Sequence, residues 1–260
     1  MPAGLHFACP RVRHRELKPL TQALDTLFRK LREKIDRERG FVQDAAHELR
    51  TPLAVITAQA HVLARSQDSG ERGAAHENLN HAISRASHLA RQLLVLASLD
   101  DAQQRSVRRI DVAQAVRQLL AQAAPAAMER GIDLSLEAPD TLWCAIDEPA
   151  LESIVFNLVD NAVRYGKPAG AVAVRLDGDE EGLELQVRDD GPGIAPGELE
   201  LVFERFYRGV GHDMPGSGLG LSIVRQAAAR MKGHVMVTKG VKGAGVGFRV
   251  SIPVPGFMPG

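Results

Sequence analysis

The chain has 260 residues, of which 32 are basic and 32 acidic, so its formal net charge is zero. A balanced charge argues against a general nucleic-acid-binding protein. No apolar run reaches the roughly 18 residues that a membrane-spanning helix needs. The two cysteines, Cys9 and Cys144, have neither disulfide nor metal-ligand spacing, which is typical of a reducing cytoplasm. A chain of this length accommodates two domains.

Residues 1–36 form the first predicted segment. Met1 to Lys18 is mixed in composition, with prolines and a basic cluster, which is typical either of a disordered segment or of one that follows a membrane span. A seam of leucines with heptad spacing then predicts a helix, and its members are Leu20, Leu24, Leu27 and Leu31. We expect a signalling helix that leads into the next domain.

The segment FVQDAAHELRTPLAVI, residues 41–56, combines a helical pattern with reactive side chains. Its apolar residues predict a buried seam, which consists of Val42, Ala46, Leu49, Leu53, Ile56, Ala60 and Leu63. His47 lies beside that seam with Glu48 next to it, an arrangement that suits a nucleophile in need of a base. For an isolated histidine a plain surface position would be the better interpretation. Pro52 removes a backbone donor, so we expect a kink in the turn that carries His47.

A polar connector, Ser66 to Gly73, precedes a second predicted helix from about His76 to Leu99. The apolar face of this helix consists of Leu79, Ile83, Ala86, Ala90, Leu93 and Ala97. Two amphipathic helices cannot bury their apolar faces alone, so we expect a second copy of the chain to complete a four-helix bundle. We assign residues 37–101 to this dimerisation domain and the charged residues 102–110 to a linker.

Helices and strands alternate in residues 111–255, which we assign to a second domain. The predicted helices are 112–130, 149–165 and 219–231, and the predicted strands are 132–136, 142–146, 171–176, 183–189, 234–239 and 245–252. This order predicts an α/β sandwich with its helices on one face of the sheet. The fold class of the whole chain is therefore α+β.

Four motifs follow one another in this second domain. NLVDNAVRYG carries Asn157 and Asn161 on one helix face, and VRDDGPGI carries Asp189, Gly191 and Gly193. FERFYR covers residues 203–208, and GSGLGLSIV carries Gly216, Gly218 and Gly220. Each motif alone is weak, because a glycine cluster before a helix often serves only a tight turn. All four in this order after HELRTP are not expected by chance.

With these five motifs the chain resembles the sensor histidine kinases of two-component systems. HELRTPL resembles the family's H box, and the later motifs resemble its N, G1, F and G2 boxes, over residues 41–253. The resemblance implies a dimeric four-helix bundle followed by an ATP-binding sandwich of the type shared with gyrase and a heat-shock chaperone. It also implies a homodimer that forms the cytoplasmic part of an inner-membrane sensor.

The resemblance implies a role for each nucleotide-site residue. Asp189 would accept a hydrogen bond from the adenine amine, while Gly191 and Gly193 let the backbone approach the ring. Asn157 and Asn161 would hold Mg²⁺ and the triphosphate of ATP. The remaining members of the expected site would contact the nucleoside or the phosphates, and they are Arg164, Tyr165, Arg205, Arg208, Gly216, Gly218, Leu219 and Gly220.

Two structural features would complete the nucleotide site. The start of the helix that follows Gly220 favours phosphate, because its unpaired backbone donors and its dipole attract anions. Residues 195–215 would form a mobile lid, anchored by Phe203 and Phe206. Plain core packing of these phenylalanines is about as good an interpretation, and it is compatible with the lid.

The implied reaction transfers the γ-phosphoryl group of ATP to an imidazole nitrogen of His47. Glu48 would accept or orient the proton on the other ring nitrogen. The phosphoryl group would then pass to an aspartate of a separate response regulator. Thr51, one turn after His47, would position a water for the reverse dephosphorylation, although a threonine there is often an ordinary surface residue.

Three alternatives compete with a histidine kinase. Related ATPases place a catalytic glutamate at the first position of the N box, and Asn157 at that position disfavours simple ATP hydrolysis. A silent dimeric scaffold that binds a regulator would usually have lost the histidine or a nucleotide glycine. A chain that acts mainly as a phosphatase is permitted by Thr51.

Overall fold

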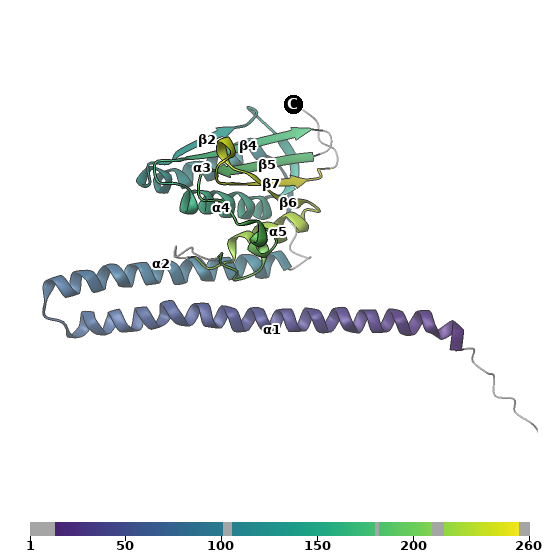
Figure 1. Cartoon of the computed structure of the whole chain (residues 1–260), viewed down its shortest axis with the longest axis horizontal. Helices are drawn as coiled ribbons and strands as arrows, with labels where there is room; N and C mark the ends of the chain where they lie inside the picture. Colours follow the sequence, from purple (N-terminus) through teal and green to yellow (C-terminus); the bar gives the residue numbers. More distant parts are fainter. Residues whose placement is uncertain (1–13, 101–105, 180–181, 210–215, 255–260) are drawn as a thin grey trace, which may run out of the picture. The chain divides into compact units, whose positions relative to one another are not determined.

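The computed structural model describes residues 14–100, 106–179, 182–209 and 216–254 (Figure 1). The chain forms two compact units, residues 1–48 and 49–260. The expectations for residues 1–13, for Cys9, and for parts of the linker and lid fall outside the described residues. In the part of the chain that is described, no helix is long and apolar enough to cross a membrane.

Helix α1, His14–Arg65, contains both the predicted signalling helix and the helix of the H box. It begins at His14, so the end of the segment predicted to be irregular is helical. The helix continues through Pro52 without interruption, and one turn later the Thr57 hydroxyl donates to the Leu53 carbonyl at 2.9 Å.

Helix α2, Ser69–Asp100, begins earlier than predicted and leaves a connector of three residues, 66–68. The reason is a cap: the Asp68 carboxylate accepts from the backbone amides of Gly70 at 3.1 Å and Glu71 at 3.4 Å. Because Asp68 satisfies these first amides, Gly70 and Gly73 lie inside the helix instead of in a loop.

Within one chain the predicted apolar seams of these two helices are only partly buried. The exposed members include Val42, Leu53 and Ile83, together with Leu24, Leu27, Leu31 and Ile35. The apolar residues that are buried instead are Ala45, Ala75, Ala82, Leu89, Leu96 and Leu99. The described residues of one chain leave these side chains exposed, so their burial by a second copy of the chain stays a prediction.

Residues 107–252 form the second domain. Its helices are α3 (Val112–Glu129), α4 (Glu148–Tyr165) and α5 (Gly220–Arg230). Its strands are β1 (Val107–Asp111), β2 (Asp133–Glu137), β3 (Trp143–Asp147), β4 (Ala171–Asp179), β5 (Gly182–Asp189), β6 (His234–Lys239) and β7 (Val246–Ile252). Its described residues also include the short 3₁₀ helices η2 (Pro196–Glu198), η3 (Leu201–Phe203) and η4 (Val241–Gly243).

Strand β1 occupies part of the segment that was predicted to be a linker. It pairs antiparallel with β3, so that Val107 lies opposite Asp147. Its last residue, Asp111, also caps α3 by accepting from the Ala113 amide at 3.1 Å. The linker prediction is therefore wrong from Val107 onward, because pairing with β3 makes these charged residues a strand.

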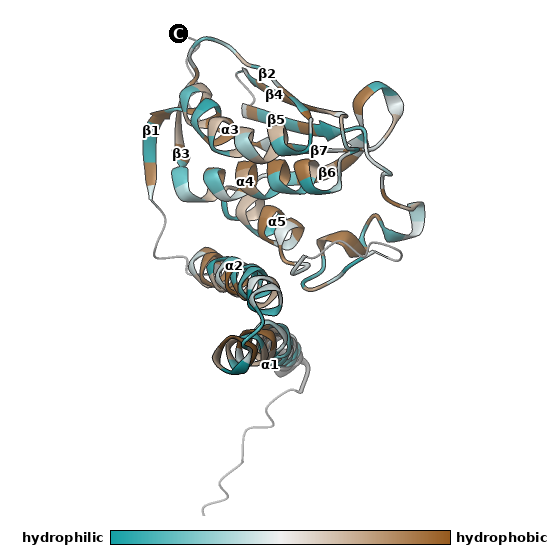
Figure 2. Ribbon diagram, turned by 90° about the vertical axis from the view of Figure 1, so that its left-hand side faces the viewer, coloured by the Kyte–Doolittle hydropathy of each residue, from teal (hydrophilic) through white to brown (hydrophobic). Residues whose placement is uncertain are grey.

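The five-stranded sheet has the order β2-β4-β5-β7-β6, and the first pair is parallel while the others are antiparallel. Figure 2 shows α3, α4 and α5 on one face of this sheet. Side chains in β5 alternate between buried and half-buried. Helix α4 contacts β5, and its residues Leu151, Ile154 and Leu158 are fully buried. The predicted α/β sandwich is confirmed.

Candidate nucleotide site and phosphoacceptor helix

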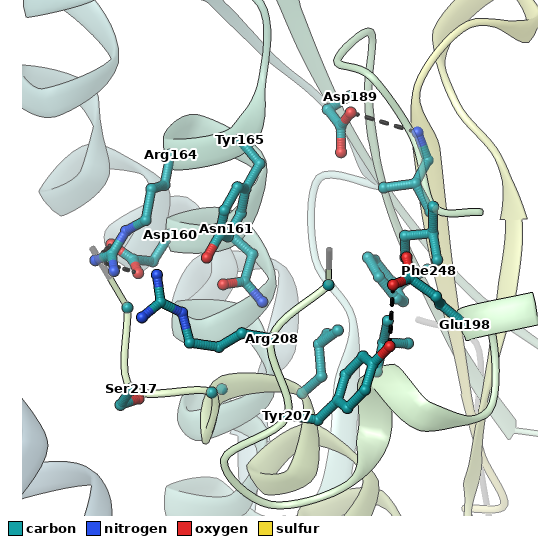
Figure 3. Close-up of a pocket in the computed structure, with 18 of the residues that line it drawn as sticks. Asp160, Asn161, Arg164, Tyr165, Asp189, Glu198, Tyr207, Arg208, Ser217 and Phe248 are labelled. Atoms are coloured by element: carbon teal, nitrogen blue, oxygen red, sulfur yellow. Dashed lines mark hydrogen bonds and ion pairs between the residues drawn. The ribbon is translucent and has the colours of Figure 1, made fainter. Parts of the chain in front are cut away.

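A cavity that is partly open to solvent lies between α4, the end of β5 and the start of α5 (Figure 3). Of the residues predicted to contact nucleotide, those that line it are Asn161, Arg164, Tyr165, Asp189, Gly193, Arg208, Gly216, Gly218 and Gly220. Four others lie beside the cavity lining and not in it: Asn157, Gly191, Arg205 and Leu219. Segments far apart in the sequence thus converge on one site.

Asp189 ends β5 with its carboxylate held by the backbone. Its Oδ1 accepts from the Gly191 amide at 2.8 Å and from the Val246 amide at 3.3 Å. Burial raises the pKa of this carboxyl group, and the hydrogen bonds from the two backbone amides partly offset that shift. With Oδ1 occupied, Oδ2 is the oxygen that can accept from a ligand.

The turn before β7 comes unusually close to Asp189. Gly245 has φ +73°, and a Cβ there would lie 2.3 Å from the Asp189 carbonyl oxygen. A side chain at this position would therefore displace the carboxylate. Glycine here permits the approach that brings the Val246 amide to Oδ1.

The two asparagines of α4 lie directly beneath the start of α5. The Asn157 Nδ2 donates to the Ser153 carbonyl at 2.7 Å, which orients its Oδ1 away from that turn. A Cβ on Gly220 would lie 3.2 Å from the Asn157 Oδ1 and 3.4 Å from the Asn161 Nδ2. Glycine at the start of α5 therefore allows the helix terminus to lie close to both carboxamide side chains.

Arg164 carries an acidic partner that sequence reasoning missed. Its Nη2 contacts the Asp160 Oδ2 at 2.9 Å, and both side chains are partly exposed at the cavity wall. In Figure 3 Arg208 points from the opposite wall toward this pair. The i,i+4 spacing of an acid and a base on α4 was the available signal.

The described part of the predicted lid is fixed by one aromatic contact and two hydrogen bonds. Phe203 is buried and meets Phe248 edge-to-face at 6.1 Å between ring centroids. The Tyr207 hydroxyl donates to Glu198 at 3.0 Å, and the Phe206 amide donates to the Gly218 carbonyl at 2.9 Å. Phe203 therefore has the packing role that was weighed for it.

Arg205, the other arginine of the predicted lid, does not line the cavity. Its Nη2 donates to the Gln226 side chain of α5 at 3.0 Å. Of the two lid arginines, the structure brings only Arg208 to the cavity.

His47, Glu48 and Thr51 share one exposed stretch of α1. Consecutive helical positions point about 100° apart and Thr51 lies one turn after His47, so the three side chains face solvent on adjoining sides. A protein partner or a nucleotide can reach an imidazole in such a position. The predicted acceptor is accessible, as transfer requires.

The cavity residues that were not predicted from the sequence include three further polar side chains. Gln92 and His88 come from α2, and Ser217 lies in the glycine loop. Burial lowers the pKa of His88. The charge of Arg164 lowers this pKa further, and the charge of Asp160 raises it. Nothing in the local pattern of α2 marks a polar residue for a nucleotide cavity, since its partners belong to a different domain.

Two protein families match this chain, and they correspond to the two predicted domains. Residues 146–256 match the family described as histidine kinase-, DNA gyrase B- and HSP90-like ATPases, so the sandwich belongs to this class of nucleotide-binding domain. Residues 37–102 match the His kinase A phospho-acceptor domain.

Relatives that match more than nine tenths of this chain are named as sensor proteins or histidine-protein kinases. The swarming motility regulation sensor protein RssA of Serratia marcescens is 33% identical over 92% of this chain and 52% of its own length. The histidine-protein kinase/phosphatase MprB of Mycobacterium sp. is 35% identical over 94% of this chain and 49% of its own. A solved mycobacterial MprB structure, 31% identical, covers 59% of this chain and all of that chain with a TM-score of 0.51.

The chain belongs to the sensor histidine kinases of two-component systems, which confirms the predicted family. It spans about half the length of the curated relatives it matches.

Proposed function

We propose that this chain is an ATP-dependent protein-histidine kinase that phosphorylates its own His47. The observation that carries the proposal is the single cavity that gathers Asn161, Asp189 and Gly220 from three motifs, in a chain that also exposes a histidine beside a carboxylate. The matches to an ATPase family and a phospho-acceptor domain support the same conclusion.

Within the cavity we assign each end of ATP by its chemistry. The Asp189 Oδ2 accepts from the adenine amine, because its Oδ1 is already engaged by backbone amides. The phosphates lie toward the start of α5, where Arg208 and the helix dipole offset their charge.

Asn157 and Asn161 are the residues that would hold Mg²⁺. Their carboxamides meet at the start of α5, and they offer neutral oxygens of the kind this cation accepts together with phosphate oxygens and waters. No cluster of three or more His, Cys, Asp or Glu among the described residues offers a different metal site. Bound Mg²⁺ supplies charge neutralisation on the triphosphate.

His47 then acts as the nucleophile. One imidazole nitrogen forms a bond to the γ-phosphorus while the bond to the bridging oxygen breaks, and ADP leaves with the electron pair. Glu48 takes the proton from the other ring nitrogen. The phosphoryl group passes next to an aspartate of a response regulator.

Two further parts of the function follow from α1 and α2. The exposed apolar residues Leu53 and Ile83 are covered by a second copy of the chain in a four-helix bundle. Thr51, exposed one turn after His47, orients a water that removes phosphate from the regulator.

The test is incubation of the purified chain with γ-labelled ATP and Mg²⁺. Label that is stable to base and labile to acid should appear on the protein and disappear in His47→Gln. His61→Gln, an exposed histidine on the same helix, is the matched control and should retain the label. Free phosphate without labelled protein would identify an ATPase instead, and absence of nucleotide binding would identify a scaffold.

A further inference from the structure

Gln92 is a buried polar residue on α2, with 7% of its surface exposed. It lies between the apolar residues Leu89 and Leu96, which are also buried. A buried carboxamide destabilises a fold unless hydrogen bonds satisfy it, so its partners explain why it is tolerated.

Both partners of Gln92 belong to the nucleotide-binding domain. Its Nε2 donates to the Asn157 Oδ1 at 3.2 Å, and its Oε1 accepts from the Ser217 hydroxyl at 2.5 Å. Ser217 in turn accepts from the Leu219 amide at 3.1 Å, immediately before α5. One side chain of α2 therefore bridges the N-box helix and the glycine loop.

The bridge uses the atom that the proposed metal site requires. The Asn157 Nδ2 is engaged by the Ser153 carbonyl, so Oδ1 is the oxygen that this residue can offer to Mg²⁺. An N–H donor carries partial positive charge, and a divalent cation on the same oxygen repels it. Mg²⁺ and the Gln92 amide thus compete for one oxygen.

The same bridge lies where phosphates are expected. Gln92 and Ser217 both line the cavity beside Gly218 and Gly220. A phosphate group at the start of α5 would accept hydrogen bonds from the Ser217 hydroxyl and from nearby backbone amides. The Ser217 hydroxyl cannot donate to the phosphate while its proton is donated to Gln92.

We propose that Gln92 is an autoinhibitory gate: while it bridges Asn157 and Ser217, α2 holds the nucleotide-binding domain in a state with low affinity for Mg²⁺-nucleotide, and binding of that ligand opens the bridge. The proposal rests on the magnesium and phosphate positions of the proposed function. Occupancy of the nucleotide site thereby removes one of the contacts between α2 and this domain.

A second contact holds α2 and this domain together independently of the gate. The Arg230 Nη1 donates to the carbonyls of Ser98 and Leu99 at 3.0 and 3.1 Å, at the end of α2. This contact shares no residue with the Gln92 bridge. Opening of the bridge therefore changes the nucleotide site without requiring that the domain separate from α2.

The test measures the Kd for ADP by calorimetry on the purified chain. Gln92→Met keeps the length of the side chain and removes both hydrogen bonds, so it should bind Mg²⁺-ADP about tenfold more tightly than the parent. In EDTA, which removes Mg²⁺, the gain in ADP affinity should fall to about threefold, because only the competition between phosphate and Gln92 for Ser217 remains. Asn80→Met, at an exposed amide on the same helix, is the matched control and should leave both constants unchanged.

Hydrogen exchange gives a readout without ligand: amides of 88–96 should exchange faster in Gln92→Met than in the parent. Equal ADP affinities of Gln92→Met and the parent in Mg²⁺ overturn the gate, and weaker binding by the variant makes Gln92 a ligand of the nucleotide instead. Absence of binding in both proteins overturns the proposed function as well, so the two failures are distinguishable.

Discussion

Arg230 and Asp147 form a buried ion pair, with the Arg230 Nε 2.8 Å from the Asp147 Oδ2 and side chains that are 6% and 5% exposed. The pair joins the last turn of α5 to the residue that precedes α4. A buried pair adds little net stability over an apolar replacement, but removing one partner leaves a charge without compensation. This pair is therefore a sensitive point of the nucleotide-binding domain.

Arg230→Met should lower the free energy of unfolding by about 3–5 kcal/mol, because Asp147 would stay buried without its partner. The exposed pair between Arg225 and Glu204 provides the control. Arg225→Met should cost less than about 1 kcal/mol, since water screens that pair. Urea unfolding of both variants measures the difference, and similar losses would contradict the assignment.

Asp189→Asn should weaken ADP binding by about 10- to 100-fold, because its remaining oxygen must serve the amides of Gly191 and Val246. The new NH₂ group then faces the adenine amine, and two donors cannot pair. Titration with ADP measures this loss. GDP affinity should not fall in parallel, since guanine presents a carbonyl at the corresponding position.

The same substitution should change the pH dependence of stability in the absence of nucleotide. Burial raises the pKa of Asp189 above 3.8, so the folded state binds its proton more tightly than the unfolded chain. The stability from that proton is present below pH 3.8 and is lost as pH rises through the folded pKa. Asp189→Asn should therefore be more stable than the parent at neutral pH and lose this advantage under acid conditions. A constant difference across the whole range would exclude burial as the cause.

The sequence predicted long, strongly patterned elements well. The predicted helix 149–165 differs from α4 by one residue at its start, because its amphipathic pattern and the proline at its beginning are local signals. Asp189, Asn161 and the glycines were assigned to one site from motifs, and the structure brings them together. These features depend on residues close to one another in the chain.

The features that sequence reasoning missed depend on distant partners. Strand β1 has a charged sequence with no clear alternation, and it is defined by pairing with β3. Gln92 contacts residues that are 65 and 125 positions away, so no local pattern marks it as part of a nucleotide cavity. The cap at Asp68 extended α2 through two glycines that looked like loop residues.

Gly220→Ala separates nucleotide binding from fold stability. A Cβ there would crowd the Asn157 Oδ1 at 3.2 Å, so affinity for Mg²⁺-ADP should fall by about tenfold. The free energy of unfolding should change by less than about 1 kcal/mol, because Gly220 is the first residue of α5 and the full preference of alanine over glycine applies to a helix interior. Gly197→Ala, where a Cβ meets open space, is the control and should retain the parent's affinity. Loss of stability together with affinity would mean that Gly220 is needed for packing only.

Glu48→Gln tests the base assigned beside His47. Gln keeps the size of the side chain but cannot accept the proton, so the rate of His47 phosphorylation should fall by about 100-fold. ATP affinity should not change, because Glu48 lies outside the nucleotide cavity. Glu38→Gln, at an exposed position on the same helix, is the control and should phosphorylate at the parent rate. A Glu48→Gln variant that is phosphorylated at the parent rate would contradict the assignment of Glu48 as the base.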